Sequence, residues 1–246
     1  MEITGKKVLI TGANRGLGRA LALACAQAAA EEIIACARRP ETLDALQADV
    51  SGLQTRITPV RLDVTSDEQV RAAAEQVGRV DILINNAGIG VFGGVLKGEF
   101  EAVRREADVN YLGAIRMVRA FAPAMAEHGD GIIVNVASQL GKASLPAMGT
   151  YCATKAALLS LSQAMRGDLA PAGVRVIAVL PGTLDTDMSK GFDIPKLPPL
   201  AAAEEILDAI LREEREVAIG DEARKLLSDM AADPVAVEDA FSQFRA

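Results

Sequence analysis

A serine, a tyrosine and a lysine stand at a spacing that suits acid–base chemistry. Ser138 ends a short apolar run, Tyr151 follows thirteen residues later, and Lys155 comes four residues after Tyr151. Positions i and i+4 of a helix share one face, so the phenol and the ammonium address one point. Moving a phenol pKa from ~10 to ~7 takes about 4 kcal/mol, and a lysine ~5 Å away supplies about 3 kcal/mol at an effective dielectric of ~20. We expect Tyr151 to exchange a proton and Ser138 to hydrogen-bond a carbonyl oxygen.

Histidine is nearly absent, which excludes several kinds of site. The 246 residues carry a net charge of −7 and include one histidine, His128, and no tryptophan. Sites that need two histidines, such as HExxH zinc sites, are excluded, and we expect no metal. A Ser-His-Asp triad would need His128, which stands before Gly129 where a helix is expected to end and suits a capping position.

Cysteine use and composition limit the compartment and the partners. The three cysteines, Cys25, Cys36 and Cys152, form no CxxC pair and are typical of free thiols in a reducing compartment. The N-terminus has no apolar signal, and no apolar run reaches the ~18 residues of a membrane span. An acidic chain with eight aromatic residues does not suit nucleic acid. We therefore expect a cytoplasmic protein with neither nucleic-acid nor membrane partners.

A glycine-rich turn follows the first expected strand. Residues 7–10 are apolar except for Lys7, and Thr11 then leads into a segment with three glycines before a helical stretch. Such glycines let backbone N–H groups approach a pyrophosphate and let the helix pack close to the strand. The expected contacts are Gly12, Asn14, Arg15, Gly16, Leu17 and Gly18.

Arginines after the second strand favour a phosphorylated dinucleotide. The strand 33–37 ends without a carboxylate and is followed by Arg38 and Arg39, while Arg15 can approach the same point. A carboxylate there would bind the ribose 2′-hydroxyl of NADH, whereas arginine pairs with the 2′-phosphate of NADPH. Residues 1–40 carry six basic and three acidic groups, a net charge of 6 − 3 = +3. NADPH is therefore favoured over NADH.

Alternating strands and helices predict an α/β fold. We expect one Rossmann-type doubly wound domain over residues 1–246, with about seven mainly parallel strands and helices on both faces. The strands are expected at 7–10, 33–37, 57–62, 82–85, 132–136, 174–179 and 217–219. The helices are expected at 16–30, 67–77, 100–125, 150–169, 202–215, 222–230 and 235–244, the second behind a capping box of Thr65 and Glu68.

Taken in order, these motifs resemble the short-chain dehydrogenase/reductase family over residues 5–190. The matching positions are Thr11–Gly18, Asp63, Asn85–Gly88, Asn110, Ser138, Tyr151 with Lys155, and Pro181, Gly182 and Thr186. The resemblance implies that Tyr151 is the general acid/base, that Lys155 lowers its pKa and binds the nicotinamide ribose, and that Ser138 orients the substrate oxygen. It also implies that Asn110 holds a water of a proton relay through a local kink in its helix.

The same resemblance implies further cofactor contacts. Asp63 and Val64 would bind the adenine, and the Asn86–Gly88 segment would pass beside the cofactor. Residues 181–186 would hold the nicotinamide carboxamide. These cofactor residues are Asp63, Val64, Asn86, Ala87, Gly88, Tyr151, Lys155, Pro181, Gly182, Thr183, Leu184 and Thr186.

Two regions depart from a regular pattern. The segment 182–200 is the longest irregular stretch and is interpreted as a substrate loop. Gln139, Leu140, Met188 and Phe192 are candidates for a mainly apolar substrate pocket. Residues 221–246 read as two short charged helices that are atypical of the family, and no activity follows from them.

The favoured function is the NADPH-dependent reduction of an aldehyde or ketone. One alternative is an NAD(P)-dependent alcohol or hydroxysteroid dehydrogenase that works in oxidation. Another is an NADP-sensing binding protein without turnover. The partner is then a small carbonyl or alcohol substrate, and surplus apolar surface on the helices near 110–125 and 150–169 predicts a homo-oligomer, either a dimer or a tetramer.

Overall fold

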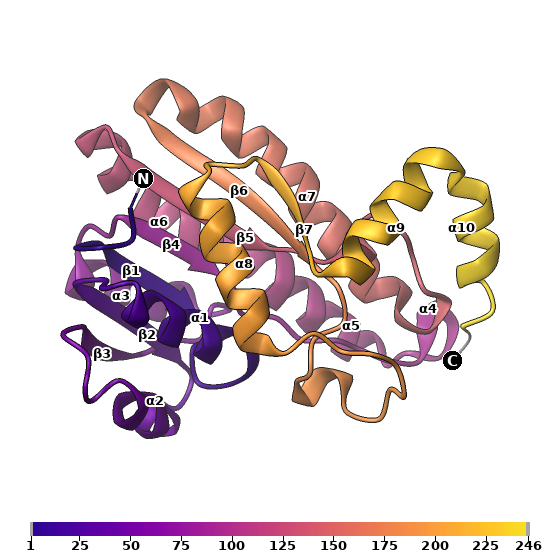
Figure 1. Ribbon diagram of the computed structural model, residues 1–246, viewed down its shortest axis with the longest axis horizontal. Helices are drawn as coiled ribbons and strands as arrows, with labels where there is room; N and C mark the ends of the chain where they lie inside the picture. Colours follow the sequence, from indigo (N-terminus) through magenta and orange to yellow (C-terminus); the bar gives the residue numbers. More distant parts are fainter. Residues whose placement is uncertain (1, 245–246) are drawn as a thin grey trace.

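Seven parallel strands form one sheet in the computed structural model, which describes residues 2–244 (Figure 1). The strands are β1 Lys7–Thr11, β2 Glu32–Ala37, β3 Arg56–Arg61, β4 Ile82–Asn85, β5 Gly131–Val136, β6 Val174–Pro181 and β7 Glu216–Ile219. Their order is β3-β2-β1-β4-β5-β6-β7, so the direction of winding reverses between β1 and β4. The doubly wound fold predicted from the sequence is confirmed.

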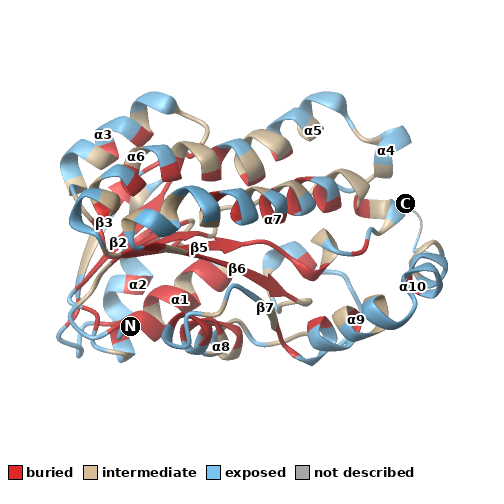
Figure 2. Cartoon of the chain, turned by 90° about the horizontal axis from the view of Figure 1, so that it is seen from above, coloured by how far each residue is buried: buried red, intermediate tan, exposed pale blue. Residues whose placement is uncertain are grey.

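Helices cover both faces of the sheet, as Figure 2 shows. They are α1 Gly16–Gln27, α2 Asp44–Asp49, α3 Asp67–Val77, α4 Gly94–Lys97, α5 Phe100–Ala107, α6 Gly113–His128, α7 Gly149–Leu169, α8 Pro199–Leu211, α9 Asp221–Ala232 and α10 Pro234–Phe241. Leu21, Leu46 and Ile206 bring α1, α2 and α8 onto one face. Val70, Phe121 and Met165 bring α3, α6 and α7 onto the other. Strands buried on both faces explain the nearly continuous apolar runs of β2, β4 and β5.

The strand boundaries agree with the sequence to within two residues, and the helix boundaries differ more. The helix expected at 100–125 is interrupted by a π-helical segment, Asp108–Leu112, which joins α5 to α6. The helix expected at 202–215 begins at Pro199 and ends at Leu211. The expected capping box was wrong: Ser66 caps α3 by accepting a hydrogen bond from the N–H of Gln69, because Thr65 is bonded to Asp63.

Two smaller expectations are confirmed. His128 is the last residue of α6, and Gly129 follows it in the left-handed conformation at φ 76°. Cys25, Cys36 and Cys152 are buried free thiols. No helix within residues 2–244 is long and apolar enough to cross a membrane.

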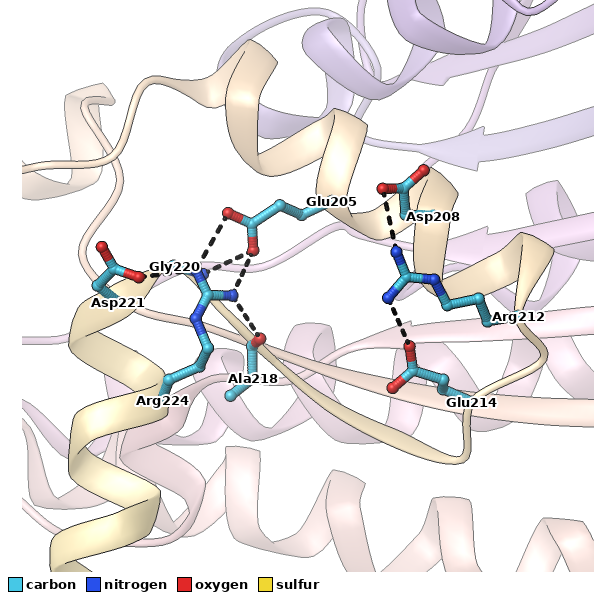
Figure 3. A network of polar contacts seen from close by, with 8 residues as sticks. All are labelled: Glu205, Asp208, Arg212, Glu214, Ala218, Gly220, Asp221 and Arg224. Atoms are coloured by element: carbon cyan, nitrogen blue, oxygen red, sulfur yellow. Dashed lines mark hydrogen bonds and ion pairs between the residues drawn. The ribbon is translucent and has the colours of Figure 1, made fainter.

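Helix α9 is fixed to α8 and to the end of β7 through a charged cluster (Figure 3). Arg224 of α9 donates to Glu205 of α8 at 2.8 Å and to Asp221 at 2.9 Å, and the N–H of Gly220 also donates to Glu205. Burial alone would raise the pKa of Glu205, but the bonds from Arg224 and Gly220 lower it below its usual value. This cluster determines where α9 begins relative to the end of β7.

Candidate functional site

A cavity of about 530 Å³ opens at the carboxyl ends of the strands. It lies where the strand order reverses between β1 and β4, the place where open α/β sheets bind ligands. All of the cofactor and substrate residues proposed from the sequence line this cavity. Of the two remaining predicted residues, Ser138 also lines the cavity, and Asn110 lies in the π-helical segment and is 2% exposed.

The glycine turn forms the floor of the cavity beneath the start of α1. A Cβ atom on Gly18 would lie 2.1 Å from the carbonyl oxygen of Gly12, so no side chain fits there. Gly16 has φ +52°, which favours glycine. Arg15 precedes α1 without capping it through its side chain. The first N–H groups of α1 therefore remain available to an anion, and the turn fits a pyrophosphate.

Thr11 ties the glycine turn to the segment after β4. Its hydroxyl oxygen accepts hydrogen bonds from the N–H groups of Asn86 and Ala87 at 2.9 and 3.0 Å. The side-chain amide of Asn86 donates in return to the carbonyl of Thr11 at 2.9 Å. These bonds hold two neighbouring strand ends in register at the point where the winding reverses.

Positive charge gathers at the end of β2. Arg38, Arg39 and Thr42 line the cavity there, together with Asp63 and Arg105. Burial alone would raise the pKa of Asp63, but bonds from Thr65 and the charges of Arg38 and Arg105 hold it below its usual value. Arg15 turns away from this group, because its guanidinium donates to Asp187 at 2.8 Å across the cavity.

The proposed catalytic side chains meet at the end of β5. Ser138, Tyr151 and Lys155 are 7%, 8% and 4% exposed, and all three line the cavity. The ammonium of Lys155 donates to the carbonyl of Val136 at 2.8 Å and lies 5.6 Å from the centre of the Tyr151 ring. The i, i+4 spacing on α7 therefore brings both groups to one point beside Ser138.

The expected lowering of the Tyr151 pKa by Lys155 is not found in the chain by itself. Burial raises the pKa of Tyr151 to about 12, although hydrogen bonding to Ser138 opposes the rise. Burial also lowers the pKa of Lys155 to about 8. The loss of water around each side chain is the main cause of both shifts, and the phenol is protonated at neutral pH.

Asn110 uses its side chain to hold the loop after β4. Its Oδ1 accepts from the N–H of Ile89, and its Nδ2 donates to the carbonyl of Ile89, both at 2.9 Å. The same Nδ2 donates to the hydroxyl of Thr154 at 3.0 Å. The π-helical segment provides the kink that the resemblance implied, and the water relay stays a prediction.

Several apolar side chains line the cavity. Leu140, Met188 and Phe192, the apolar candidates for a substrate pocket, are among them, together with Ile89 and Met148, and their role toward a substrate stays a prediction. At its mouth Phe192 meets Phe92 edge to face, with ring centres 5.6 Å apart. A Cβ on Gly90 would lie 3.2 Å from Met148 and 3.7 Å from Met188, so both thioethers reach the same point. 

Gln139 and Thr183 are linked by a residue from α9. The carboxylate of Glu222 accepts from Nε2 of Gln139 at 2.5 Å and from the N–H of Thr183 at 2.6 Å. Glu222 thus connects the segment after Ser138 to the segment after Pro181 and Gly182. The C-terminal helices also pack on the loop before Tyr151, where Ala143 contacts Leu226 and Val237.

Several site residues were not found by sequence reasoning. Thr42, Arg105 and Met148 line the cavity without belonging to a motif. Glu106 and Glu222 contact site segments from helices, where acidic residues are common. Arg39, by contrast, lines the cavity as the two adjacent arginines after β2 indicated.

Comparisons with known proteins agree with this geometry. The sequence model of short chain dehydrogenases matches residues 6–195. A short chain dehydrogenase from Burkholderia cenocepacia, solved in complex with NADP, is 38% identical and superimposes with a TM-score of 0.91 over 98% of this chain and 99% of its own.

Two curated proteins are also similar. The 3-oxoacyl-(acyl-carrier-protein) reductase of Thermotoga maritima is 35% identical over 77% of this chain and 78% of its own length. The glycine betaine reductase of Emericella nidulans is 34% identical over 76% of this chain, which spans only 15% of that larger protein.

Proposed function

Because the chain belongs to the short-chain dehydrogenase/reductase family, we propose that this oxidoreductase reduces an aldehyde or a ketone to an alcohol with NADPH. The observation that carries the proposal is the buried group of Ser138, Tyr151 and Lys155 on one wall of the cavity. The group supplies a proton donor, a hydrogen bond for an oxygen that gains charge, and a cation.

The residues of the chain fit a phosphorylated dinucleotide. Gly18 lets the start of α1 pack directly against the glycine turn, and the N–H groups at the start of α1 suit a pyrophosphate. Arg38 and Arg39 lie at the end of β2, where a 2′-phosphate favours arginine. The NADP complex of the Burkholderia protein supports the same choice by analogy.

The proposed reaction adds a hydride and a proton across the carbonyl. When bound, NADPH supplies the hydride to the carbonyl carbon. The hydroxyl of Ser138 donates a hydrogen bond to the carbonyl oxygen, and Tyr151 transfers its phenolic proton to that oxygen. Lys155 provides positive charge beside the phenolate that remains, which favours proton transfer.

The protonated Tyr151 supplies the acid that reduction requires. Burial raises its pKa to about 12, so the phenol holds its proton at neutral pH. The same group would return the proton in the oxidative alternative, and the two directions are distinguished by the activity measured with each. A binding protein without turnover has no use for three buried polar groups at one point, since their burial costs free energy.

The lining supports a substrate with an apolar substituent. Ile89, Leu140, Met148, Met188 and Phe192 provide branched alkyl groups, two flexible thioethers and one flat ring in the lining. A thioether pocket adapts to aromatic and alicyclic groups. A carboxylate or a row of hydroxyls on the substrate would lose water against these apolar side chains.

The test is a panel of carbonyl compounds followed by NADPH consumption. We expect kcat/KM for an aryl alkyl ketone to exceed that for a polyhydroxy ketone or a keto acid by roughly tenfold or more. Tyr151→Phe should lower kcat by about 100-fold or more, with the Kd for NADPH changed by less than about twofold. Tyr111→Phe, which alters the other tyrosine, is the matched control. Substantial turnover by Tyr151→Phe would refute the proposal.

A further inference from the structure

Glu106 is a fully buried carboxyl group close to the proposed catalytic side chains. It lies in the last turn of α5 and is 0% exposed. Its Oε1 accepts a hydrogen bond from the N–H of Val91 at 2.6 Å, and the hydroxyl of Thr150, in the first turn of α7, also bonds to the carboxyl group. A fully buried carboxylate is costly even with these bonds, so its presence here calls for a compensating charge.

The helix that carries Glu106 packs against the helix that carries the catalytic pair. Asn110 follows Glu106 by four residues, and it binds Ile89 on one side and Thr154 of α7 on the other. The two side chains therefore hold neighbouring residues of the same loop, Ile89 and Val91, beside α7. That loop also passes Lys155, since a Cβ on Gly88 would lie 3.5 Å from its ammonium nitrogen.

The titratable groups of α7 within electrostatic reach of Glu106 are Tyr151, Cys152 and Lys155. Lys155 is a cation in its protonated form, whereas the tyrosine and the cysteine are neutral until they lose a proton. The charge of Glu106 raises the pKa of all three groups, and burial raises the pKa of Glu106 itself. 

We propose that Glu106 is a positioning residue for the reaction, which holds the loop at Val91 and serves as the buried counter-charge that keeps Lys155 protonated. The inference rests on the proposed function. Without a negative neighbour, a lysine that is 4% exposed would more readily release its proton. The cation that supports proton transfer from Tyr151 would then be lost at a lower pH.

Glu106→Gln separates the two parts of this role. The glutamine oxygen can still accept from Val91, whereas the charge is removed. Protonated Lys155 loses its stabilising neighbour, so the fall of kcat/KM at high pH should move about half a unit to one unit toward lower pH. Glu101→Gln, which removes an exposed charge from the same helix, should leave that fall in its wild-type position. Glu106→Asp keeps the charge and should also stay near the wild type.

A second measurement needs neither cofactor nor substrate. In a Tyr111→Phe background, Tyr151 is the remaining tyrosine, and the chain has no tryptophan. The ultraviolet absorbance of phenolate then reports Tyr151 directly. When Glu106→Gln removes the charge, phenolate absorbance should appear at a pH lower by about half a unit to one unit.

The outcomes separate this inference from the proposed function. An unmoved pH profile together with unmoved phenolate absorbance in Glu106→Gln would overturn the role of Glu106, even if the variant melts at a lower temperature. If the wild-type protein reduces no carbonyl compound, the proposed function fails. The phenolate measurement would in that case still decide whether the charge of Glu106 reaches Tyr151.

Discussion

Arg38 offers the sharpest test of cofactor choice at a single residue. It lies exposed at the end of β2, lines the cavity and is near enough to Asp63 to lower the pKa of that carboxyl. An arginine in this place attracts a phosphate, and an aspartate would repel it. The difference between NADPH and NADH is that one phosphate group.

We expect Arg38→Asp to weaken NADPH binding by about 100-fold and NADH binding by less than about threefold, since two units of charge reverse beside the 2′-phosphate. The quenching or enhancement of nicotinamide fluorescence on titration gives both dissociation constants. Arg71→Asp makes the same change on the exposed side of α3 and should affect neither. Equal losses for both cofactors in Arg38→Asp would count against a 2′-phosphate contact.

The position of helix α9 leads to a prediction about cofactor binding. The pair of Arg224 and Glu205 fixes α9 to α8 (Figure 3), and Glu222 then reaches Gln139 and Thr183. Its carboxylate has acceptor oxygens alone, so it fixes the amide of Gln139 with the Nε2 group toward α9. α9 thereby holds together the two segments of the cavity wall that contain Gln139 and Thr183.

Glu222→Ala should therefore loosen the wall on the nicotinamide side. We expect the Kd for NADPH to rise about tenfold, equivalent to about 1.4 kcal/mol. Asp221→Ala removes the neighbouring carboxylate, which contacts Arg224 instead of the cavity wall, and should change the Kd by less than about twofold. If the two variants bind NADPH equally well, α9 has no part in shaping the site.

Regular elements could be predicted from the sequence because their burial leaves a pattern. Runs such as 33–37 and 132–136 are apolar throughout, as strands covered on both faces must be. The π-helical segment Asp108–Leu112 has no comparable signal, because its residues occur equally well in an α-helix. α2 and α4 have six and four residues, too few for a helical period to appear.

Some residues of the candidate site could likewise be predicted from the sequence, and others could not. Motifs of glycine, asparagine and proline indicated most of the cavity, since each requires a special backbone or a fixed contact. Glu106 and Glu222 could not be predicted, because an acidic residue on a helix is usually exposed. Their roles depend on which loops pack beside α5 and α9. The spacing of Tyr151 and Lys155 indicates that the two groups are close, but it does not reveal how deeply they are buried. The rise of the Tyr151 pKa through burial could therefore not be predicted from the sequence.

The outer face of α7 is a candidate surface for association between copies of the chain. Figure 2 shows this helix on the surface of one helix layer, and Ala153, Ala156 and Ala164 are exposed along it. Leu112, at the start of α6, is 41% exposed. Small apolar residues let a second helix approach closely, and an apolar face in contact with water favours association. The homo-oligomer expected from the sequence therefore stays a prediction, now with a defined surface.

Ala156→Arg tests that surface without entering the core. If copies of the chain associate through α7, a buried arginine without a partner would oppose the contact by several kcal/mol, and the mass in solution should fall to that of one chain. Light scattering after gel filtration gives the mass. Ala45→Arg places the same side chain on exposed α2, across the sheet from α7, and should leave the assembly intact. A wild-type protein with the mass of a single chain, or an Ala156→Arg variant that assembles as the wild type does, would exclude α7 as the interface.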